Sequence, residues 1–510
     1  MVKRRIIGIC ISVIVVAFLG SGVLYYSGYD LQDFIGEEAS EEISVLLRPV
    51  EDTTKNAIND LTKAYNIILE DGTRDFYAGY QVDQAFLMWL NKRFGDDTIM
   101  DLAYRIYEGY GHRDLWYHET GNSIHVLWLM YCEEKQYESY NLKNVYWMEN
   151  TDDHTVTIDF TGDINLADEW YTMQKAITCA NGVYDCLSVD VIKELQSADI
   201  SVINNEYVLT DGGDRQIDKA YTFGAKTANV SMLQAFGADL ANLANNHAYD
   251  YREEGLRDTI QTLESSGIAS IGAGANLEDA RAVKYFVVNG RKIAFVAATE
   301  IERYTNYTKP ATKTEAGVFK TKDISLVEET IREAEETSDY VVMNIHWGNE
   351  GSLRYTDAQC RMAERFILAG ADAVIGGHPH RLQGIEYIHD VPVAFSLGNF
   401  WFSTGTLYTT IAQIHIDKDG NLSLRMIPCM QKDLMVTKLS SGETENFYKY
   451  VADISKDIAI DKNGYIYNSE NMKPEEKDNT HLWYSGMSYG TYSESRDLED
   501  RKIDIVGNLQ

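Results

Sequence analysis

The sequence predicts a layered α/β domain that follows an N-terminal transmembrane helix and a helical module. From Thr155 onward, strand-like apolar runs alternate with helix-like stretches, which is the pattern of layered α/β architecture. The 510 residues are 45% hydrophobic and 11% aromatic, which is enough for a sizeable core. The stretch from Ile6 to Tyr29 contains no charged residue. These observations indicate a folded protein of several domains.

The N-terminal apolar stretch has the features of a membrane anchor. Its 24 residues are long enough to cross a bilayer as a helix, and Lys3, Arg4 and Arg5 precede it. A positive cluster at this place puts the N-terminus in the cytoplasm and the rest of the chain outside. A cleaved signal peptide is the alternative, but the run exceeds the usual h-region and no clear A-x-A site follows it. We therefore expect an uncleaved single-pass anchor in the cell membrane, over residues 1–29, with the bulk of the chain extracytoplasmic.

Residues 30–150 read as a membrane-proximal helical module. Hydrophobic residues recur at helical spacing over residues 58–68 and 99–110. The region is rich in Trp and Tyr, which suit either a ligand-stacking surface or, more commonly, a packed core. A polar cluster at 150–154 marks the boundary with the α/β domain, residues 151–430. Residues 431–510 are expected to hold one helix near 444–455 and a polar tail.

Charge and cysteine content exclude some classes of function. The chain has 46 basic and 78 acidic residues, a net charge of -32, which argues against a nucleic-acid partner because that affinity depends on neutralising phosphates. Six cysteines form no C-x-x-C pair and no evident disulfide framework. Cys179 and Cys186 are spaced to close a small loop, but we expect single buried thiols.

Polar side chains follow five strand-like runs of the α/β domain. Helices are expected near 184–197, 228–236 and 255–266, and the Asn289-Gly290 dipeptide suits a type I′ hairpin turn. Ligands of open α/β folds collect at the carboxyl ends of strands, so the side chains at these ends are expected to converge. The run at 156–160 leads to Asp163 and Asn165, the run at 198–205 to Glu206, that at 239–243 to Asn246 and His247, that at 341–345 to His346, and that at 373–375 to His378 and His380.

These residues outline a metal site. Gly376 and Gly377 permit a sharp turn and close backbone approach before His378, and Pro379 stiffens the spacing to His380. Imidazole nitrogens with carboxylate and amide oxygens, and no thiolate, favour Mn, Fe, Zn or Co. Six candidate ligands exceed the needs of one tetrahedral ion and suit two ions bridged by a carboxylate and a hydroxide, roughly 3.5 to 4 Å apart. The alternative is that the histidines are unrelated loop residues.

An ordered set of short motifs resembles a known family. Gly162-Asp163, N-E, A-N-N-H, H-W-G, G-G-H-P-H and S-L-G-N-F occur in the order found in the bacterial CapA/PgsA family, the capsule and poly-γ-glutamate biosynthesis proteins. That family is similar to the calcineurin-like metallophosphoesterases, and the likeness covers residues 155–430. It implies that His247 is the catalytic acid and that two divalent metal ions are bound by Asp163, Glu206, Asn246, His346, His378 and His380.

The sequence departs from the family pattern at two places. Where the general metallophosphoesterase pattern opens with D-x-H, this chain has Asn165, which leaves a possible metal or water contact through an amide. The loop T-F-G-A-K, residues 222–226, lacks the arginine and proline usual in the family, so substrate contacts there are not implied.

The leading functional hypothesis is a membrane-anchored, dinuclear-metal-dependent hydrolase. It would act in synthesis, export or trimming of an anionic capsule polymer such as poly-γ-glutamate. The alternatives are a phosphoesterase for a small substrate and a non-catalytic subunit of a polymer synthase complex. A net charge of -32 opposes binding of a polyanion, but Arg252, Arg354 and Arg381 lie near the metal motifs and are candidates for a basic collar that binds substrate. The alternative is that they are ordinary surface arginines.

Overall fold

The computed structural model describes residues 84–95, 98, 115–136, 143–151, 154–302, 307–472 and 482–484, which fall into two units. The first unit holds the described residues before 142 together with the turn 289–292, and the second holds the remainder. The predicted anchor, residues 1–29, and the predicted helical stripes at 58–68 and 99–110 lie outside the described residues. In the described ranges, every helix is too short or too polar to cross a membrane.

The first unit contains the helices α5 (Gln84–Phe94), α7 (Leu115–Thr120) and α8 (Ile124–Lys135). Helix α8 begins after Ser123, whose hydroxyl oxygen accepts a hydrogen bond from the Val126 N–H. Phe86, Trp89 and Tyr131 are buried, with ring centroids 5.4 to 5.7 Å apart. The aromatic residues of this unit therefore include a packed core, as expected for rings at helical spacing.

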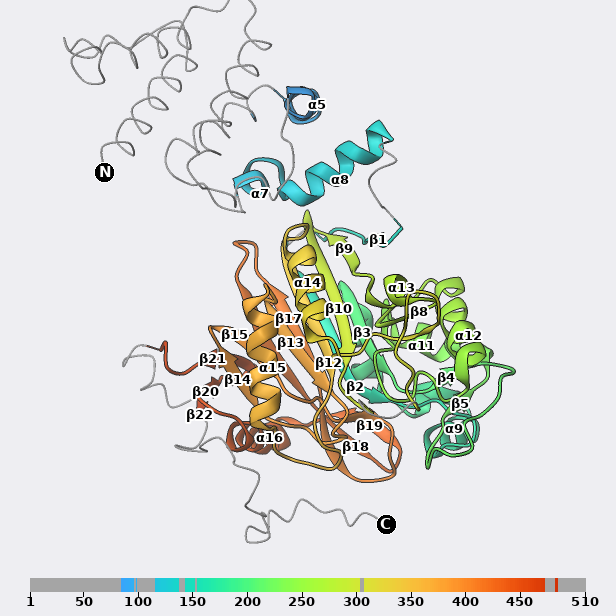
Figure 1. The fold of residues 1–510 in the computed structure, drawn as a ribbon. Helices are drawn as coiled ribbons and strands as arrows, with labels where there is room; N and C mark the ends of the chain where they lie inside the picture. The colour runs from blue at the N-terminus through green and yellow to red at the C-terminus, as the bar shows by residue number, and fades with distance from the viewer. Residues whose placement is uncertain are drawn as a thin grey trace, which may run out of the picture. The chain divides into compact units, whose positions relative to one another are not determined.

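The second unit is built around two large sheets (Figure 1). In the seven-stranded sheet, β10, β12 and β13 are adjacent and parallel, so their carboxyl ends lie at one edge. The order across this sheet is β1 (Val145–Trp147), β9 (Lys284–Val288), β10 (Arg291–Thr299), β12 (Tyr340–His346), β13 (Ala373–Gly377), β15 (Val391–Ala394) and β14 (Ile385–Ile388).

The eleven-stranded sheet contains a second parallel block, β2, β3, β6 and β7. The order is β22 (Trp483–Tyr484), β20 (Ile458–Ile460), β21 (Tyr465–Asn468), β18 (Leu422–Lys432), β17 (Leu407–Ile416), β2 (Val156–Ile164), β3 (Ile200–Asn205), β6 (Leu240–Asn242) and β7 (Ala269–Ile271), with β16 (Asn399–Trp401) on β2 and β19 (Met435–Lys438) on β18. Two-stranded sheets form from β4 (Val208–Leu209) with β5 (Gly224–Ala225), and from β8 (Ala273–Gly274) with β11 (Gly317–Val318).

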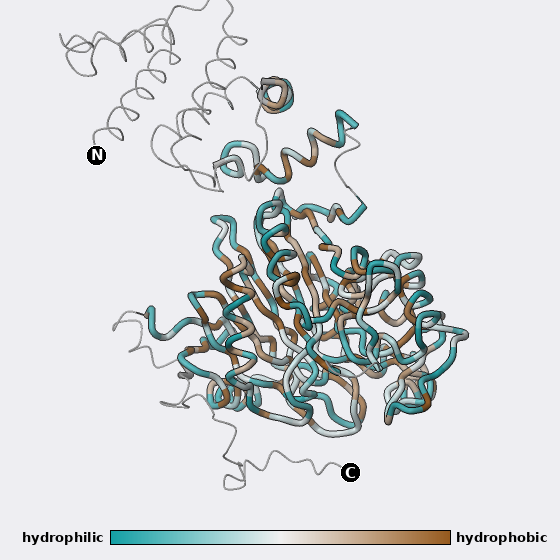
Figure 2. Tube along the Cα trace, viewed as in Figure 1, coloured by the Kyte–Doolittle hydropathy of each residue, from teal (hydrophilic) through white to brown (hydrophobic). Residues whose placement is uncertain are grey.

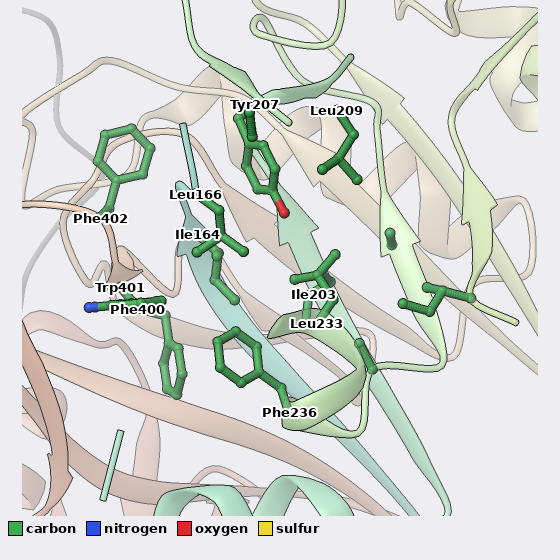
Figure 3. Packing of buried hydrophobic residues seen from close by; sticks show 14 of the residues in the cluster. Ile164, Leu166, Ile203, Tyr207, Leu209, Leu233, Phe236, Phe400, Trp401 and Phe402 are labelled. Atoms are coloured by element: carbon green, nitrogen blue, oxygen red, sulfur yellow. The ribbon is translucent and has the colours of Figure 1, made fainter. Parts of the chain in front are cut away.

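Three hydrophobic clusters define the layers. One lies between the two sheets and includes Phe160 of β2 and Phe295 of β10, whose ring centroids are 6.4 Å apart. A second packs Ile203 of β3 against Phe236 and the other buried residues of α10 (Val189–Ser197), α11 (Val230–Phe236) and α12 (Arg252–Ser265) (Figure 3). The third joins Met343 of β12 to α14 (Ile324–Glu335) and α15 (Asp357–Leu368). The order of layers is therefore helix, sheet, sheet, helix.

Hydrophobic residues run along the central strands, and hydrophilic residues dominate the outer loops (Figure 2). This distribution explains why the strand-like runs were visible in the sequence, and the predicted mixed α/β architecture is confirmed. Asn289 and Gly290 have φ values of 49° and 72°, as the predicted type I′ turn requires.

The C-terminal part differs from the expected helix and polar tail. Helix α16 (Ser441–Ile454) matches the predicted helix near 444–455, and its capping box at Ser440 and Glu443 fixes its start. Residues 431–472, however, continue the second unit and add β19, β20 and β21 to the eleven-stranded sheet. These strands have only three or four residues, too few for their periodicity to be read from the sequence. The remaining short helices are α9 (Tyr171–Ala176) and α13 (Leu277–Arg281).

Candidate metal centre

Carboxyl ends of parallel strands from both sheets meet at one place. Asp163 lies at the end of β2, Glu206 directly follows β3, and His346 ends β12. The remaining ligand candidates lie on the turns after β6 and β13. Two overlapping groups of possible metal ligands result. The first contains Asp163, Glu206 and His380, and the second contains Glu206, His346 and His378. In each group, every residue offers one ligand atom that lies within 4.8 Å of those of the other two. The structure thus brings the predicted side chains together, and they come from two sheets.

Glu206 is common to both groups, and its surroundings are those of a metal ligand. Its side chain is 0% exposed, and neither carboxylate oxygen has a hydrogen-bond partner. Oε1 lies 3.4 Å from His346 Nε2 and 3.8 Å from His380 Nε2. A buried carboxylate without hydrogen-bond partners is costly unless it is neutralised or coordinates a metal. The donor set therefore fits a divalent cation on either side of Glu206.

The first group is organised around Asp163 and His380. His380 Nδ1 lies 2.8 Å from Asp163 Oδ2 and 2.9 Å from Asn399 Oδ1, and Asn204 donates to Asp163 Oδ1 at 2.7 Å. Burial alone would lower the pKa of His380, but the carboxylates of Glu206 and Asp163 raise it to about 9. Burial also opposes ionisation of Asp163, yet the hydrogen bond and positive charge of His380 lower its pKa. The carboxylates thus concentrate negative charge at this point.

The second group is organised around His346 and His378. Their ring centroids are 4.9 Å apart, and His346 Nε2 lies 2.8 Å from Asn246 Oδ1. Nδ1 of each histidine is buried without a hydrogen-bond partner. Burial lowers the pKa of His378 well below its ordinary value, and the neighbouring His346 adds to this shift. His378 is therefore held as neutral imidazole, the form that ligates metals.

The G-G-H-P-H turn needs unusual backbone geometry to deliver two histidines. A Cβ on Gly376 would lie 2.0 Å from the Phe395 carbonyl oxygen, and one on Gly377 would lie 3.1 Å from Asp163 Oδ1. The close backbone approach predicted for these glycines is therefore confirmed. His378 and His380 adopt φ values of 97° and 56°, in the left-handed region that disfavours residues with a Cβ.

His247 lies beside the cluster and is supported by two residues that the sequence analysis missed. Its Nδ1 is 2.7 Å from Asp250 Oδ2, and Lys219 Nζ is 2.9 Å from Asp250 Oδ1. The Phe223 N–H also donates to Asp250, at 2.8 Å, and the Phe223 ring centroid is 4.4 Å from that of His247. Because Nδ1 faces a carboxylate, Nε2 is the nitrogen left for another partner. The i, i+3 spacing of His247 and Asp250 was the available signal.

Asparagines connect His247 to the metal-ligand candidates. Asn245 Oδ1 accepts from the His247 N–H at 3.0 Å, and Asn245 Nδ2 donates to the Asn205 carbonyl oxygen at 2.9 Å. A small cavity of about 20 Å³ is lined by Asp163, Asn204 and several strand-end residues. These buried amides fix the strand ends relative to one another, and although Asn245 belongs to the A-N-N-H motif, its contacts are visible only in the fold.

Other predicted site residues have a different setting. The Asn165 side-chain oxygen accepts a hydrogen bond from the Ala167 N–H at 2.9 Å, so it is already engaged within the chain. Arg252 is exposed, and Arg354 and Arg381 are partly exposed. The cation beside the His247 loop is instead Lys219, which donates to the Asn246 carbonyl oxygen. Substrate binding by the three arginines stays a prediction.

Comparison with known proteins gives consistent relatives. A family described as bacterial capsule synthesis protein PGA_cap matches residues 157–404. The PGA biosynthesis protein CapA of Bacillus subtilis (strain 168) is 33% identical over 218 residues, 42% of this chain and 56% of that protein. The capsule biosynthesis protein CapA of Bacillus anthracis is 28% identical over 271 residues, 52% of this chain and 64% of that protein.

A third relative, from Mycobacterium tuberculosis (strain ATCC 25618 / H37Rv), is named as a probable polyglutamine synthesis accessory protein. It is 26% identical over 290 residues, 53% of this chain and 76% of that protein. The chain spans less than two thirds of the length of the two CapA relatives. The matched region includes all of the strand ends that form the candidate metal centre.

Proposed function

We propose that this chain acts in the biosynthesis of a poly-glutamate capsule as a metal-dependent hydrolase. The premise is that residues 157–404 belong to the family of bacterial capsule synthesis proteins, the CapA/PgsA family. The observation that supports hydrolase chemistry is the Glu206 carboxylate, which is fully buried without a hydrogen-bond partner and shared by two groups of ligands. A buried carboxylate shared by two ligand groups suits a dinuclear centre of the kind that catalyses hydrolysis.

The residues divide between two metal positions. His346, His378 and Asn246 would hold one ion, Asp163 and His380 the other, and Glu206 would contribute to both. When bound, two divalent ions supply Lewis acidity at a phosphoryl or acyl centre. The identity of the donors favours Mn, Fe, Zn or Co over Ca or Mg.

His247 would act as the general acid for the leaving group. Asp250 holds Nδ1 at 2.7 Å and thereby directs Nε2 away from itself. A proton on Nε2 can be given to a departing oxygen or nitrogen that is a poor leaving group. Lys219 balances the Asp250 charge from the other side, at 2.9 Å, so that the carboxylate orients the imidazole without being left as an unpaired buried charge.

The site would act outside the cytoplasm, on an anionic polymer or on an intermediate of its synthesis or export. This part of the proposal follows from the uncharged stretch Ile6 to Tyr29 with its preceding basic cluster. Protease added to intact cells should degrade the chain beyond about residue 30. Full protection of the ectodomain would contradict this topology.

Metal analysis of purified variants tests the centre itself. We expect close to two ions per wild-type chain and a marked loss in His378→Ala, because His378 belongs to one of the two ligand groups. His389→Ala is the matched control, since His389 is an exposed histidine paired with Glu364 at 3.2 Å. Unchanged metal content in His378→Ala would remove His378 from the site.

A pair of substrates tests the chemistry. His247→Ala should retain its metals and slow hydrolysis of a substrate with a poor leaving group by about 10²- to 10⁴-fold. Turnover of a nitrophenyl ester, whose leaving group needs no proton, should fall much less. Equal losses with both substrates would refute the acid role, and a metal-loaded wild-type chain that hydrolyses neither phosphoesters nor γ-glutamyl peptides would favour a non-catalytic subunit.

A further inference from the structure

Cys179 and Cys186, expected from sequence to be separate buried thiols, lie side by side. Both pack in the cluster on the outer face of the eleven-stranded sheet. Cys179 lies close enough to Cys186 to contribute to the raised pKa of the Cys186 thiol, and both residues are free cysteines. Cys186 is fully buried, whereas Cys179 is partly exposed. One member of the pair is therefore accessible to a reagent and the other is buried.

The backbone between the cysteines brings them together independently of the sulfur contact. The Asn181 side chain donates to Asp185 Oδ1 at 2.9 Å, and the Asn181 N–H donates to Asp185 Oδ2 at 3.0 Å. The Gly182 N–H donates to the Cys179 carbonyl oxygen at 3.3 Å, and a 3₁₀ turn occupies Gly182–Asp185. This segment is thus a closed turn with Cys179 and Cys186 at its two ends, which suits a disulfide across a short loop.

We propose that Cys179 and Cys186 form a reversible disulfide by exchange with an external disulfide. The partly exposed Cys179, as thiolate, attacks one sulfur of a low-molecular-weight or protein disulfide and releases the first thiol. The Cys186 thiolate then attacks Cys179 in the mixed disulfide and displaces the second thiol. The two cysteines together lose two protons and two electrons, and the donor disulfide gains them as two thiols.

The order of the two steps follows from the environment of each sulfur. Burial, and then the adjacent Cys179, raise the pKa of Cys186 to about 12, so Cys186 is a poor first nucleophile. Cys179 lies at the surface end of the turn and meets the donor first. The reaction does not depend on the metal centre or on hydrolase activity.

The bond would join two parts of the second unit. The Val436 N–H of β19 donates to the Cys186 carbonyl oxygen at 2.8 Å, so Cys186 is fixed to the sheet. Cys179 follows α9, where Thr172 donates to the carbonyl oxygen of Asn165, two residues beyond Asp163. Oxidation would therefore tie the segment that follows the metal-bearing strand β2 to the residue that is bonded to β19 of the same sheet.

The full-length chain, incubated across a series of glutathione to glutathione disulfide ratios and then alkylated, tests the proposal. Peptide mass spectrometry should show a Cys179–Cys186 link that is two hydrogens lighter than the reduced pair, with a sigmoidal dependence on the ratio. Cys179→Ser and Cys186→Ser should form no intramolecular link. Cys360→Ser is the matched control, because Cys360 is a partly exposed thiol elsewhere, 3.9 Å from Glu386, and it should leave the link unchanged.

A thermal melt provides a second measurement. The oxidised wild type should unfold about 2 °C or more above the reduced wild type, because the bond restricts the unfolded chain, and Cys179→Ser should show no such difference. Three results would overturn the proposal: alkylation of both thiols at every ratio, glutathione on Cys179 without closure onto Cys186, or a link from either cysteine to another one. The wild-type experiment decides the matter even where a variant folds poorly.

Discussion

Replacing Asp159 with asparagine should stabilise the protein at alkaline pH, and the gain should disappear in acid. Asp159 lies on β2 and is 0% exposed, and only one of its oxygens has a partner, Gln413 Nε2 at 2.9 Å. Burial raises the pKa of Asp159 from 3.8 to about 7. The folded state therefore binds the proton more tightly than the unfolded state does. Because of Asp159, the free energy of unfolding of the wild type falls as pH rises from about 4 to about 7, and the whole of this loss remains above pH 7.

The magnitude follows from the size of the shift. A difference of about three pKa units corresponds to about 4 kcal/mol of unfolding free energy at pH 8, at about 1.36 kcal/mol per unit. The uncharged amide that Asp159→Asn introduces can still accept a hydrogen bond from Gln413 through its oxygen, so the variant should recover most of this amount.

Urea denaturation of the full-length chain at pH 8, 6 and 4.5, followed by tryptophan fluorescence, measures the effect. The difference between Asp159→Asn and wild type should be largest at pH 8 and fall towards zero at pH 4.5. Asp190→Asn, which changes an exposed carboxylate on α10, is the control and should show no comparable gain. A gain at pH 8 below about 1 kcal/mol, or one of equal size at all three pH values, would refute the reasoning from burial.

Three further changes examine the support of the site and the packing of the sheet. Asn204→Ala removes the 2.7 Å hydrogen bond to Asp163, so calorimetric titration should show metal affinity lowered by about 10- to 100-fold, and an unchanged affinity would argue against a supporting role. Lys219→Met leaves Asp250 without its cation, so turnover of a substrate with a poor leaving group should fall while metal content stays constant, and metal loss would contradict this. Gly162→Ala places a Cβ 2.0 Å from the Gly398 carbonyl oxygen and should cost about 2 kcal/mol or more in a urea melt, whereas Gly405→Ala, with no atom nearer than 3.7 Å, should be close to neutral.

The sequence was informative where hydrophobic runs end in unusual polar residues. His346, Glu206 and His378 lie at or directly after the ends of buried strands, so a strand reading placed them correctly without knowledge of their neighbours. Periodicity does not identify which strands pair, however. Residue spacing alone therefore did not indicate that β2, β3 and β6 belong to one sheet and β12 and β13 to another.

Residues in loops were harder to predict. Asp250 and Lys219 look in sequence like ordinary solvated charges, and only the fold shows that both are buried beside His247. Asn165 occupies a motif position that suggested a metal or water contact. Its side-chain oxygen accepts a hydrogen bond from the N–H of Ala167, two residues later. Local hydrogen bonding of this kind competes with any longer-range role of an asparagine and leaves no trace in residue spacing.

The left-handed backbone at His378 and His380 places two kinds of selection in opposition. Each of these residues is held in a conformation that a side chain disfavours by about 1 kcal/mol or more and that glycine adopts freely. Glycine at either position would relax the turn and would also delete an imidazole. Directed evolution for heat resistance alone should therefore enrich glycine at 378 and 380 and drift towards proteins that are robust but inert, whereas lineages that must keep the imidazoles have to regain the lost stability elsewhere in the chain.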